Sequence, residues 1–364
     1  MTKPQVLFIG DLNTSLPEFN QFQSKFDCIF YQLTTVEQLI IDLKTRFLKI
    51  EAIYGAWLGF VPFGGFKDQI LELAPSTLKI ISICSVGYDG YDGEGMAKKN
   101  IVLTNVPSVG AAEPVAELVL YNTLLSFRQF NVFSSVLSVK NNHTVKVRKM
   151  LDQTSEFDYS TGLPRLNDGN GYAFGEMLNE RKVLSPRGHN AVIVGFGNIG
   201  QTIGKELSDI GMNIHYVKRN PLSESQQAAL GYDAKYYSSI LQTKLFVDLI
   251  VIAAPATSET NHLINEDVIN EIEKPFRIIN IGRGTIIDEQ ALVDGLNRGK
   301  VLFAGLDVFE KEPQVHPGLF GRQDVVLTPH VGASTIENFD FTAIQAMKNI
   351  ESVLTGGKPL NQVN

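Results

Sequence analysis

The stretch AVIVGFGNIG, residues Ala191–Gly200, decides the fold of this chain. An apolar run typical of a buried strand leads directly into a G-x-G-x-x-G turn, and the helical stretch QTIGKELSDIG follows. In such a turn the first glycine permits the sharp bend, the second lets backbone amides approach a pyrophosphate, and the third allows close helix packing. The pattern predicts a dinucleotide site; a glycine turn in an unrelated α/β fold is the alternative. The candidate cofactor-binding residues of this turn are Gly195, Gly197, Asn198, Ile199 and Gly200.

The second strand of the same unit, in the stretch NIHYVKRNP (Asn213–Pro221), ends in two cations. An Asp or Glu at this point accepts hydrogen bonds from the free 2′ hydroxyl of the adenosine ribose, whereas a basic residue accommodates a 2′ phosphate. Arg219 can bind phosphate oxygens through its planar guanidinium, and Lys218 adds a mobile point charge. We therefore expect NADP as the preferred cofactor. NAD is the alternative if both cations belong to a solvated turn before Pro221.

Short runs rich in valine and isoleucine alternate with longer helix-like stretches over most of the chain. The first series consists of QVLFIG, CIFYQL, AIYGAWL, LKIISIC and VLTNV, and the second of AVIVGFG, NIHYVK, LIVIAA, RIINIG, LFAGLDV and VVLTPHV. Each run has the length of a strand buried on both faces, and the spacing leaves room for crossover helices, which implies parallel sheets. At 364 residues the chain suits two domains. We predict an α/β protein with two Rossmann-like, doubly wound parallel-sheet domains.

Two long helical stretches mark the expected domain boundaries. Residues 113–133 have apolar side chains at helical spacing and should form one helix between the two units. Residues 336–356 should form a second helix, closed by glycines, that returns the chain to the first unit. We therefore place a substrate (catalytic) domain in residues 1–110 plus 336–364 and a dinucleotide-binding domain in residues 111–335.

Residues 141–188 are the least regular part of the chain. They mix Asn, Asp, Gly, Ser and Pro, as in DYSTGLPRLNDGNGY, without a sustained period. Irregular segments of this length are usually functional or mobile. We expect a long irregular arm that reaches over a neighbouring subunit, with a disordered insert as the alternative.

Composition limits the partners of the protein. A net charge of -7 offers no general attraction to nucleic acid or to an anionic membrane surface. The start, MTKPQVLFIGDLN, lacks the pattern of a secretory signal, and the most apolar window, Leu245–Ala256, is too short to span a bilayer. Cys28 and Cys84 lie in apolar surroundings and are expected to be reduced. We therefore expect a soluble, cytoplasmic protein without nucleic-acid or membrane partners.

Neither a metal centre nor a serine-hydrolase site is indicated. A nucleophile elbow is missing from the sequence. No metal is expected, because the histidines have no zinc-ligand spacing. The scattered histidines are His189, His215, His262 and His316.

Three further stretches carry candidate catalytic side chains: INIGRGTIIDEQAL with Arg283, AGLDVFEKEP with Asp307 and Glu312, and LTPHVGAST with His330. Together with the glycine turn, these ordered motifs closely resemble the D-isomer-specific 2-hydroxyacid dehydrogenase family. The resemblance extends over most of the chain and is strongest in residues 190–335. It implies reversible reduction of a 2-oxo acid to the D-2-hydroxy acid with a nicotinamide cofactor, a homodimer, and an active-site cleft between the two domains.

The resemblance also assigns roles by motif. Arg283 resembles the substrate-binding arginine of the family, His330 its acid/base, and Glu312 the carboxylate that pairs with the histidine. The backbone amides of Ser85, Val86 and Gly87 are expected to hold the substrate carboxylate. The further candidate cofactor-binding residues are Pro255, Ile281, Gly282, Asp307, His330 and Gly332.

Elementary chemistry supports the same three catalytic residues. Hydride delivery to a carbonyl carbon builds negative charge on the oxygen, which the permanently charged guanidinium of Arg283 can stabilise. His330 can donate a proton near neutral pH, and a neighbouring Glu312 favours its protonated form. The structural alternatives are a capping or bridging arginine, a histidine in a turn, and an exposed glutamate in a charged run. Asp307 either contacts the nicotinamide ribose or satisfies buried backbone groups.

Several functional alternatives remain open at this point. The leading hypothesis is an NADPH-preferring reductase of glyoxylate, hydroxypyruvate or a bulkier 2-oxo acid. A corepressor-like or scaffold protein that binds NAD(P) on the same fold is the rival, and a phosphoglycerate dehydrogenase is the second enzyme hypothesis. Trp57, Tyr88 and Tyr91 are either walls of a substrate pocket or packing residues. The segment NVPSVGAAEPVAE is about one residue longer than the family pattern.

Overall fold

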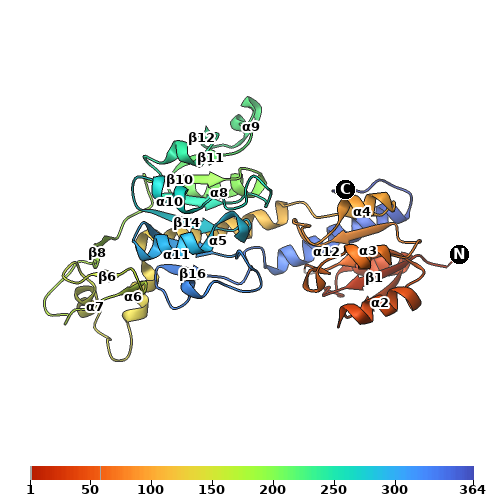
Figure 1. The fold of residues 1–364 in the computed structure, drawn as a ribbon, viewed down its shortest axis with the longest axis horizontal. Helices are drawn as coiled ribbons and strands as arrows, with labels where there is room; N and C mark the ends of the chain where they lie inside the picture. The colour runs from red at the N-terminus through yellow and green to blue at the C-terminus, as the bar shows by residue number, and fades with distance from the viewer. Residues whose placement is uncertain (1, 58) are drawn as a thin grey trace. The chain divides into compact units, whose positions relative to one another are not determined.

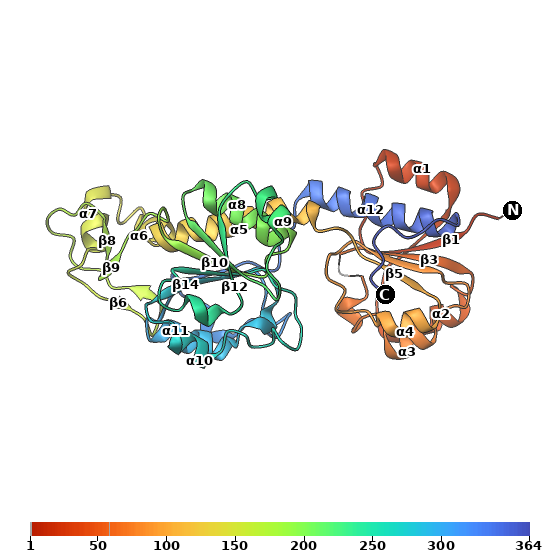
Figure 2. The same cartoon turned by 90° about the horizontal axis from the view of Figure 1, so that it is seen from above.

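The computed structural model describes residues 2–57 and 59–364, which form two compact units. Unit 1 extends to Gly110 and includes Ser334–Asn364, and unit 2 comprises Ala111–Ala333. The predicted domain limits lie after residues 110 and 335. Each unit is built on one large parallel sheet (Figures 1 and 2). The prediction of two doubly wound α/β domains is therefore confirmed.

The sheet of unit 1 has five parallel strands in the order β2-β1-β3-β4-β5. The strands are β1 (Gln5–Ile9), β2 (Asp27–Tyr31), β3 (Ile50–Gly55), β4 (Ile80–Ile83) and β5 (Val102–Thr104). The central strands are buried on both faces, which explains their continuous apolar sequences.

Different helices cover the two faces of this sheet. One face packs against α1 (Pro17–Lys25) and α12 (Ile336–Leu354), and the other against α2 (Val36–Thr45), α3 (Asp68–Glu72) and α4 (Gly93–Lys98) (Figure 2). Thr335 caps α12, and its side chain accepts a hydrogen bond from the amide of Asn338 at 3.2 Å. The predicted return helix at residues 336–356 is thus confirmed, and it supplies Ala343, Met347 and Ile350 to the core of unit 1.

The sheet of unit 2 has seven parallel strands in the order β12-β11-β10-β13-β14-β15-β16. The strands are β10 (Asn190–Val194), β11 (Asn213–Val217), β12 (Ala234–Tyr237), β13 (Leu249–Ile252), β14 (Phe276–Asn280), β15 (Val301–Leu306) and β16 (Val325–Leu327). The sequence did not predict β12. This strand lies at the sheet edge and is half-exposed, so its sequence AKYY lacks the apolar run of a central strand.

Helices also cover both faces of this second sheet. One core joins the sheet to α5 (Val109–Arg128) and α8 (Asn198–Asp209), and another joins it to α10 (Glu266–Glu271) and α11 (Glu289–Asn297) (Figure 2). The short helix α9 (Glu224–Ala229) follows β11. The 3-10 helices of the two units are η1 (Val61–Phe63), η2 (Ile240–Thr243), η3 (Gly284–Ile286) and η4 (Pro317–Leu319).

The single helix predicted for residues 113–133 is wrong in both its limits and its continuity. Helix α5 begins four residues earlier, at Val109, and ends at Arg128. Gln129 then adopts a left-handed φ of 52°, and a separate helix, α6 (Phe130–Val136), follows. A left-handed residue cannot continue a right-handed helix, so Gln129 redirects the chain into the arm.

The arm of residues 141–188 is folded, so the alternative of a disordered insert is wrong. It contains α7 (Thr144–Met150) and two antiparallel strand pairs: β6 (Phe157–Asp158) with β7 (Leu163–Pro164), and β8 (Met177–Leu178) with β9 (Arg181–Lys182). Its small core includes Val147, Leu151, Phe157 and Leu178.

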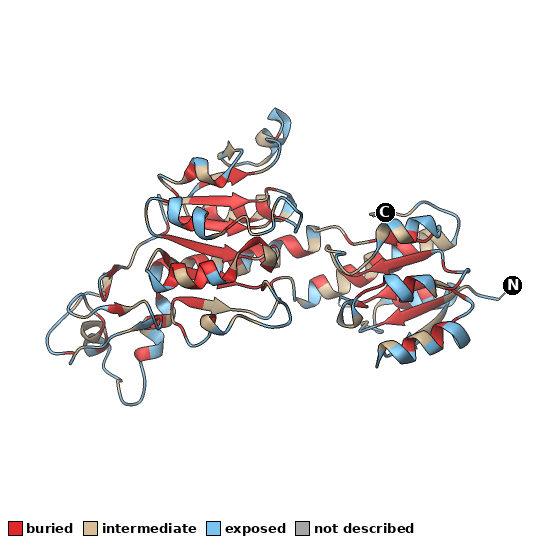
Figure 3. Cartoon of the chain, in the orientation of Figure 1, coloured by how far each residue is buried: buried red, intermediate tan, exposed pale blue. Residues whose placement is uncertain are grey.

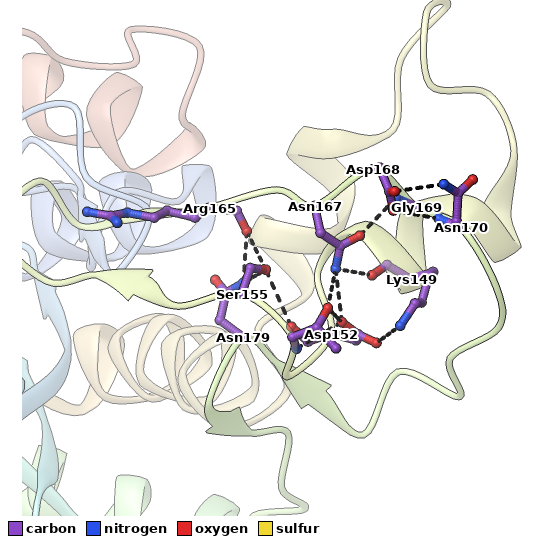
Figure 4. A network of polar contacts seen from close by, with 10 residues as sticks. Lys149, Asp152, Ser155, Arg165, Asn167, Asp168, Gly169, Asn170 and Asn179 are labelled. Carbon is purple, nitrogen blue, oxygen red and sulfur yellow. Dashed lines mark hydrogen bonds and ion pairs between the residues drawn. The ribbon is translucent and has the colours of Figure 1, made fainter.

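Polar side chains hold the arm where regular structure does not (Figure 4). Asp152 accepts hydrogen bonds from Lys149 Nζ at 2.5 Å, from the Thr154 amide at 3.0 Å and from Asn167 Nδ2 at 2.9 Å. Asn179 is fully buried, and its amide group donates to Ser155 Oγ at 2.8 Å. Turns held by side-chain hydrogen bonds do not require regularly spaced apolar residues, which explains why the sequence of residues 141–188 shows no sustained period.

Burial is concentrated in the strands of both large sheets, and the exposed residues lie mainly on the outer helix faces and in loops (Figure 3). Within residues 2–57 and 59–364, no helix has both the length and the apolar character needed to span a membrane.

Candidate active site

The glycine turn lies at the carboxyl end of β10. Gly195 adopts a left-handed φ of 90°, and a Cβ there would lie 2.6 Å from the backbone of Ala254. A Cβ on Gly200 would lie 2.3 Å from the carbonyl oxygen of Gly195, so α8 packs directly on the turn. A Cβ on Gly197, the N-cap of α8, would meet none of the described atoms within 4 Å. This open space beside the first amides of α8 fits a pyrophosphate.

The two predicted cations follow β11 directly. The amide of Gly195 donates to the carbonyl oxygen of Val217 at 2.9 Å, so Lys218 begins beside the glycine turn. Arg219 is exposed, and its Nη2 lies 3.7 Å from Oε2 of Glu259, which is also exposed. A pair of this length between exposed side chains is weak. The sequence did not indicate Glu259 as a neighbour of this position.

Arg283 lies in the loop after β14, and Asn280 shapes that loop. The Asn280 side chain is buried; its Oδ1 accepts from the Gly282 amide at 3.0 Å, and its Nδ2 donates to the Arg283 carbonyl oxygen at 2.9 Å. The guanidinium of Arg283 donates from Nη1 to the Gly282 carbonyl oxygen at 2.8 Å. A Cβ on Gly284 would lie 1.8 Å from the carbonyl carbon of Phe309. The Arg283 loop is therefore in close backbone contact with the segment that leads to Glu312.

Glu312 and His330 form the predicted acid–histidine pair. His330 Nδ1 lies 3.2 Å from Glu312 Oε2, and both side chains are 39% exposed. Glu312 Oε1 accepts a hydrogen bond from the amide of Phe309 at 3.0 Å. Burial alone would raise the pKa of Glu312, but His330, the Phe309 amide and the charge of Arg283 together lower it. The carboxylate is thus kept ionised beside the imidazole, with the guanidinium within electrostatic range.

Asp307 holds the backbone that follows His330. Its carboxylate is buried and accepts from the Val331 amide at 2.9 Å and from the Gly332 amide at 2.8 Å. Asp307 therefore satisfies buried backbone groups, and its contact with a nicotinamide ribose stays a prediction. His330 itself has a left-handed φ of 55°, and Asp307 stabilises the turn in which this conformation occurs.

The remaining candidate cofactor residues of unit 2 lie at the same edge of the sheet. Pro255 follows β13, Ile281 and Gly282 follow β14, and Gly332 follows β16. Since β13 and β14 are parallel neighbours, their carboxyl ends meet at one edge. Ligands of open α/β sheets bind at this edge.

Ser85, Val86 and Gly87 follow β4 in unit 1 and are partly exposed. Ser85 Oγ donates to the Gly87 carbonyl oxygen at 2.7 Å, and Asn105 Nδ2 donates to the Val86 carbonyl oxygen at 2.7 Å. In both bonds a carbonyl oxygen of the loop at residues 85–87 is the acceptor. The bonds hold this loop in a turn at the carboxyl end of the unit 1 sheet.

The three aromatic candidates of unit 1 differ in exposure. Trp57 and Tyr88 are 40% and 43% exposed, and their role as walls of a substrate pocket stays a prediction. Tyr91 is partly buried and packs against the apolar core of unit 1, including an edge-on contact with Phe60. Tyr91 is therefore a packing residue.

The part of the chain that the structure describes contains no group of three or more His, Cys, Asp or Glu side chains that could hold a metal ion. Within this part, Cys28 is half-buried and Cys84 is buried, and both are free thiols. Burial raises the pKa of Cys28 to about 11 and that of Cys84 to about 12, so neither thiol is set up as a nucleophile.

The chain is similar to known proteins over most of its length. Residues 167–332 match the family described as D-isomer specific 2-hydroxyacid dehydrogenase, NAD binding domain. The chain is 32% identical to a glyoxylate reductase of Thermococcus litoralis, over 81% of this chain and 80% of that protein. Its fold is similar to D-mandelate dehydrogenase of Rhodotorula graminis, with a TM-score of 0.83, 27% identity and coverage of 100% and 98%.

A second solved structure with a similar fold contains a bound cofactor. It is an NADPH-dependent glyoxylate/hydroxypyruvate reductase of Sinorhizobium meliloti in complex with NADP and malonate. The similarity has a TM-score of 0.73 at 25% identity and covers 100% of this chain and 97% of that one.

Proposed function

The chain belongs to the D-isomer-specific 2-hydroxyacid dehydrogenase family, and from this premise we propose that it reduces a 2-oxo acid to the D-2-hydroxy acid with NADPH, reversibly. The protein is an oxidoreductase of the NAD-binding type. The observation that supports the proposal most directly is the pairing of Glu312 with His330, with the charge of Arg283 acting on the same carboxylate.

Each of these side chains has a separate task in the proposed reaction. A bound nicotinamide cofactor supplies the hydride that reaches the carbonyl carbon. Arg283 stabilises the negative charge that grows on the carbonyl oxygen. In this proposal Glu312 orients the imidazole through Nδ1, and Nε2 of His330 delivers the proton to that oxygen. In the oxidative direction the same nitrogen accepts the proton from the hydroxyl group.

The substrate proposed is a short 2-oxo acid such as glyoxylate or hydroxypyruvate, or a bulkier one. In this proposal the backbone amides of Ser85, Val86 and Gly87 bind the substrate carboxylate. The exposed side chains of Trp57 and Tyr88 support the acceptance of a larger substituent. NADPH oxidation measured with glyoxylate, hydroxypyruvate and an aromatic 2-oxo acid tests the enzyme proposal. Lack of turnover with all three, together with tight NADPH binding, would favour the scaffold alternative.

The preference for NADPH rests on Lys218 and Arg219, which follow β11 beside the glycine turn. A 2′ phosphate would form charge-assisted hydrogen bonds with these cations that a hydroxyl cannot form. In Arg219→Ala the ratio of kcat/KM for NADPH to that for NADH should fall by about tenfold to a hundredfold. Steady-state kinetics with both cofactors measure this ratio, and an unchanged ratio contradicts the assignment.

The assembly proposed is a homodimer in which the arm of residues 141–188 contacts the neighbouring subunit. Tyr172 and Phe174 in this arm are 69% and 74% exposed, and exposed aromatic side chains favour an interface. Sedimentation analysis tests the state of assembly. A cytoplasmic location is proposed from the two free thiols, which suit a reducing compartment, and cell fractionation tests it.

A further inference from the structure

His262 connects the two loops that carry the predicted catalytic residues. It lies in the loop after β13, and its amide donates to the carbonyl oxygen of Thr285 at 2.8 Å. Thr285 is two residues beyond Arg283. The contact continues along the chain, because the Ile264 amide donates to the Ile286 carbonyl oxygen at 3.0 Å. The backbone of residues 262–264 therefore supports the end of the Arg283 loop.

The side chain of His262 contacts the other loop. Its Nε2 lies 3.0 Å from Oε1 of Glu310, which is two residues before Glu312. The second oxygen of Glu310 accepts from the Glu289 amide at 3.1 Å, and the Glu310 amide donates to Glu289 Oε1 at 3.0 Å. Glu310 is thus held from two sides, by a loop after β13 and by the first residue of α11.

The conformation of His262 indicates that its surroundings dictate its position. Its φ of 48° lies in the left-handed region, which non-glycine residues adopt rarely and keep only when neighbouring contacts fix them. An ordinary surface ion pair would contribute little to stability, because the two side chains are 40% and 20% exposed. The difference from an ordinary pair is that His262 bonds to both catalytic loops at once.

We propose that His262 is a positioning residue that sets the separation of Arg283 and Glu312, through its amide on one loop and its imidazole on Glu310 of the other. This inference rests on the proposed 2-oxo acid reductase function. The close approach of the same loops at Gly284 and Phe309 means that a small displacement changes the catalytic geometry. A shift of about 1 Å in a catalytic constellation can reduce the rate by about a hundredfold.

The test compares His262→Ala with His262→Gln, because a glutamine amide can donate to Glu310 from nearly the position of Nε2. In His262→Ala the reductive kcat with glyoxylate should fall by about tenfold to a hundredfold. The Kd for NADPH, measured by fluorescence in the binary complex, should remain within about twofold. His262→Gln should restore most of the rate. His316→Ala is the matched control, because the described hydrogen bonds of the His316 imidazole go to Gln290 of α11 and to the Gly318 amide of η4, and not to Glu310.

Three results would overturn the inference: a kcat of His262→Ala within twofold of the wild type, no rescue by glutamine, or a parallel loss of NADPH binding. A wild type that reduces no 2-oxo acid would refute the proposed function instead. In that case the positioning role of His262 is judged by the imidazole NMR chemical shifts of His330, which hydrogen-bonds Glu312. These chemical shifts should change in His262→Ala and return in His262→Gln, and identical chemical shifts in all three proteins would reject the inference.

Discussion

Replacing Gly284 by alanine should separate the Arg283 loop from the segment that leads to Glu312. The added Cβ would lie 1.8 Å from the carbonyl carbon of Phe309, 1.9 Å from its oxygen and 2.4 Å from the amide nitrogen of Glu310. All three are backbone atoms, so no side-chain rotation can relieve the overlap. To bring the shortest of these distances to an ordinary contact of 3.4 Å, the Arg283 loop and the Phe309 backbone must move apart by about 1.6 Å.

A displacement of this size predicts two effects of Gly284→Ala. The reductive kcat should fall by about a hundredfold, because the guanidinium and the Glu312–His330 pair would no longer share one substrate. The free energy of unfolding should fall by about 1–3 kcal/mol, the usual cost of overpacking. The assays are steady-state kinetics with saturating NADPH and thermal unfolding followed by circular dichroism.

Gly197→Ala is the matched control for this experiment. The same methyl group would meet none of the described atoms within 4 Å at Gly197, so the melting temperature should stay within about 1 °C of the wild type. The Kd for NADPH should rise by about tenfold or more, because the methyl group occupies space that a pyrophosphate needs. A Gly284→Ala protein with a kcat within threefold of the wild type would refute the reasoning about the two loops.

Two further predictions concern single carboxylates. In Glu312→Gln the reductive kcat should fall at least about tenfold, because the uncharged amide no longer holds the imidazole of His330 as a carboxylate does. A kcat within threefold of the wild type contradicts the pairing. Burial raises the pKa of Asp152, but hydrogen bonds from Lys149 and Thr154 lower it to about 2. Its stabilising effect is therefore complete above the ordinary Asp pKa and is lost as the pH falls toward 2. Asp152→Asn should lower the melting temperature by about 2–4 °C at pH 7, and the difference should narrow between pH 4 and pH 2; equal melting temperatures at pH 7 would exclude the role.

The fold could be predicted from the sequence where the apolar pattern of a segment matches its burial in the folded chain. Central strands are buried on both faces, so LIVI in β13 and FRIIN in β14 can be identified from their apolar side chains alone. The edge strand β12 and the break at Gln129 were missed for a physical reason. A half-exposed strand such as β12 has no continuous apolar run. The residues around Gln129 continue a helical pattern, so the sequence does not predict the left-handed conformation of Gln129.

In the candidate site, too, some residues could be predicted from the sequence and some contacts are known only from the structure. Gly197, Arg283, Glu312 and His330 could be predicted as site residues because each lies in a short motif whose chemistry requires that residue type. Asp307 was left between two roles, since only the folded chain brings its carboxylate to the amides of Val331 and Gly332.

By itself the sequence determined the α/β architecture and predicted the candidate reactive side chains, because strand burial and the motifs depend on residues that are close together in the chain. Only the tertiary structure decided which groups hold those side chains in place. Glu312 bonds His330 across 18 positions and His262 bonds Glu310 across 48. Such contacts join loops at the ends of different strands, so they depend on strand order and register, which no local pattern of residues specifies.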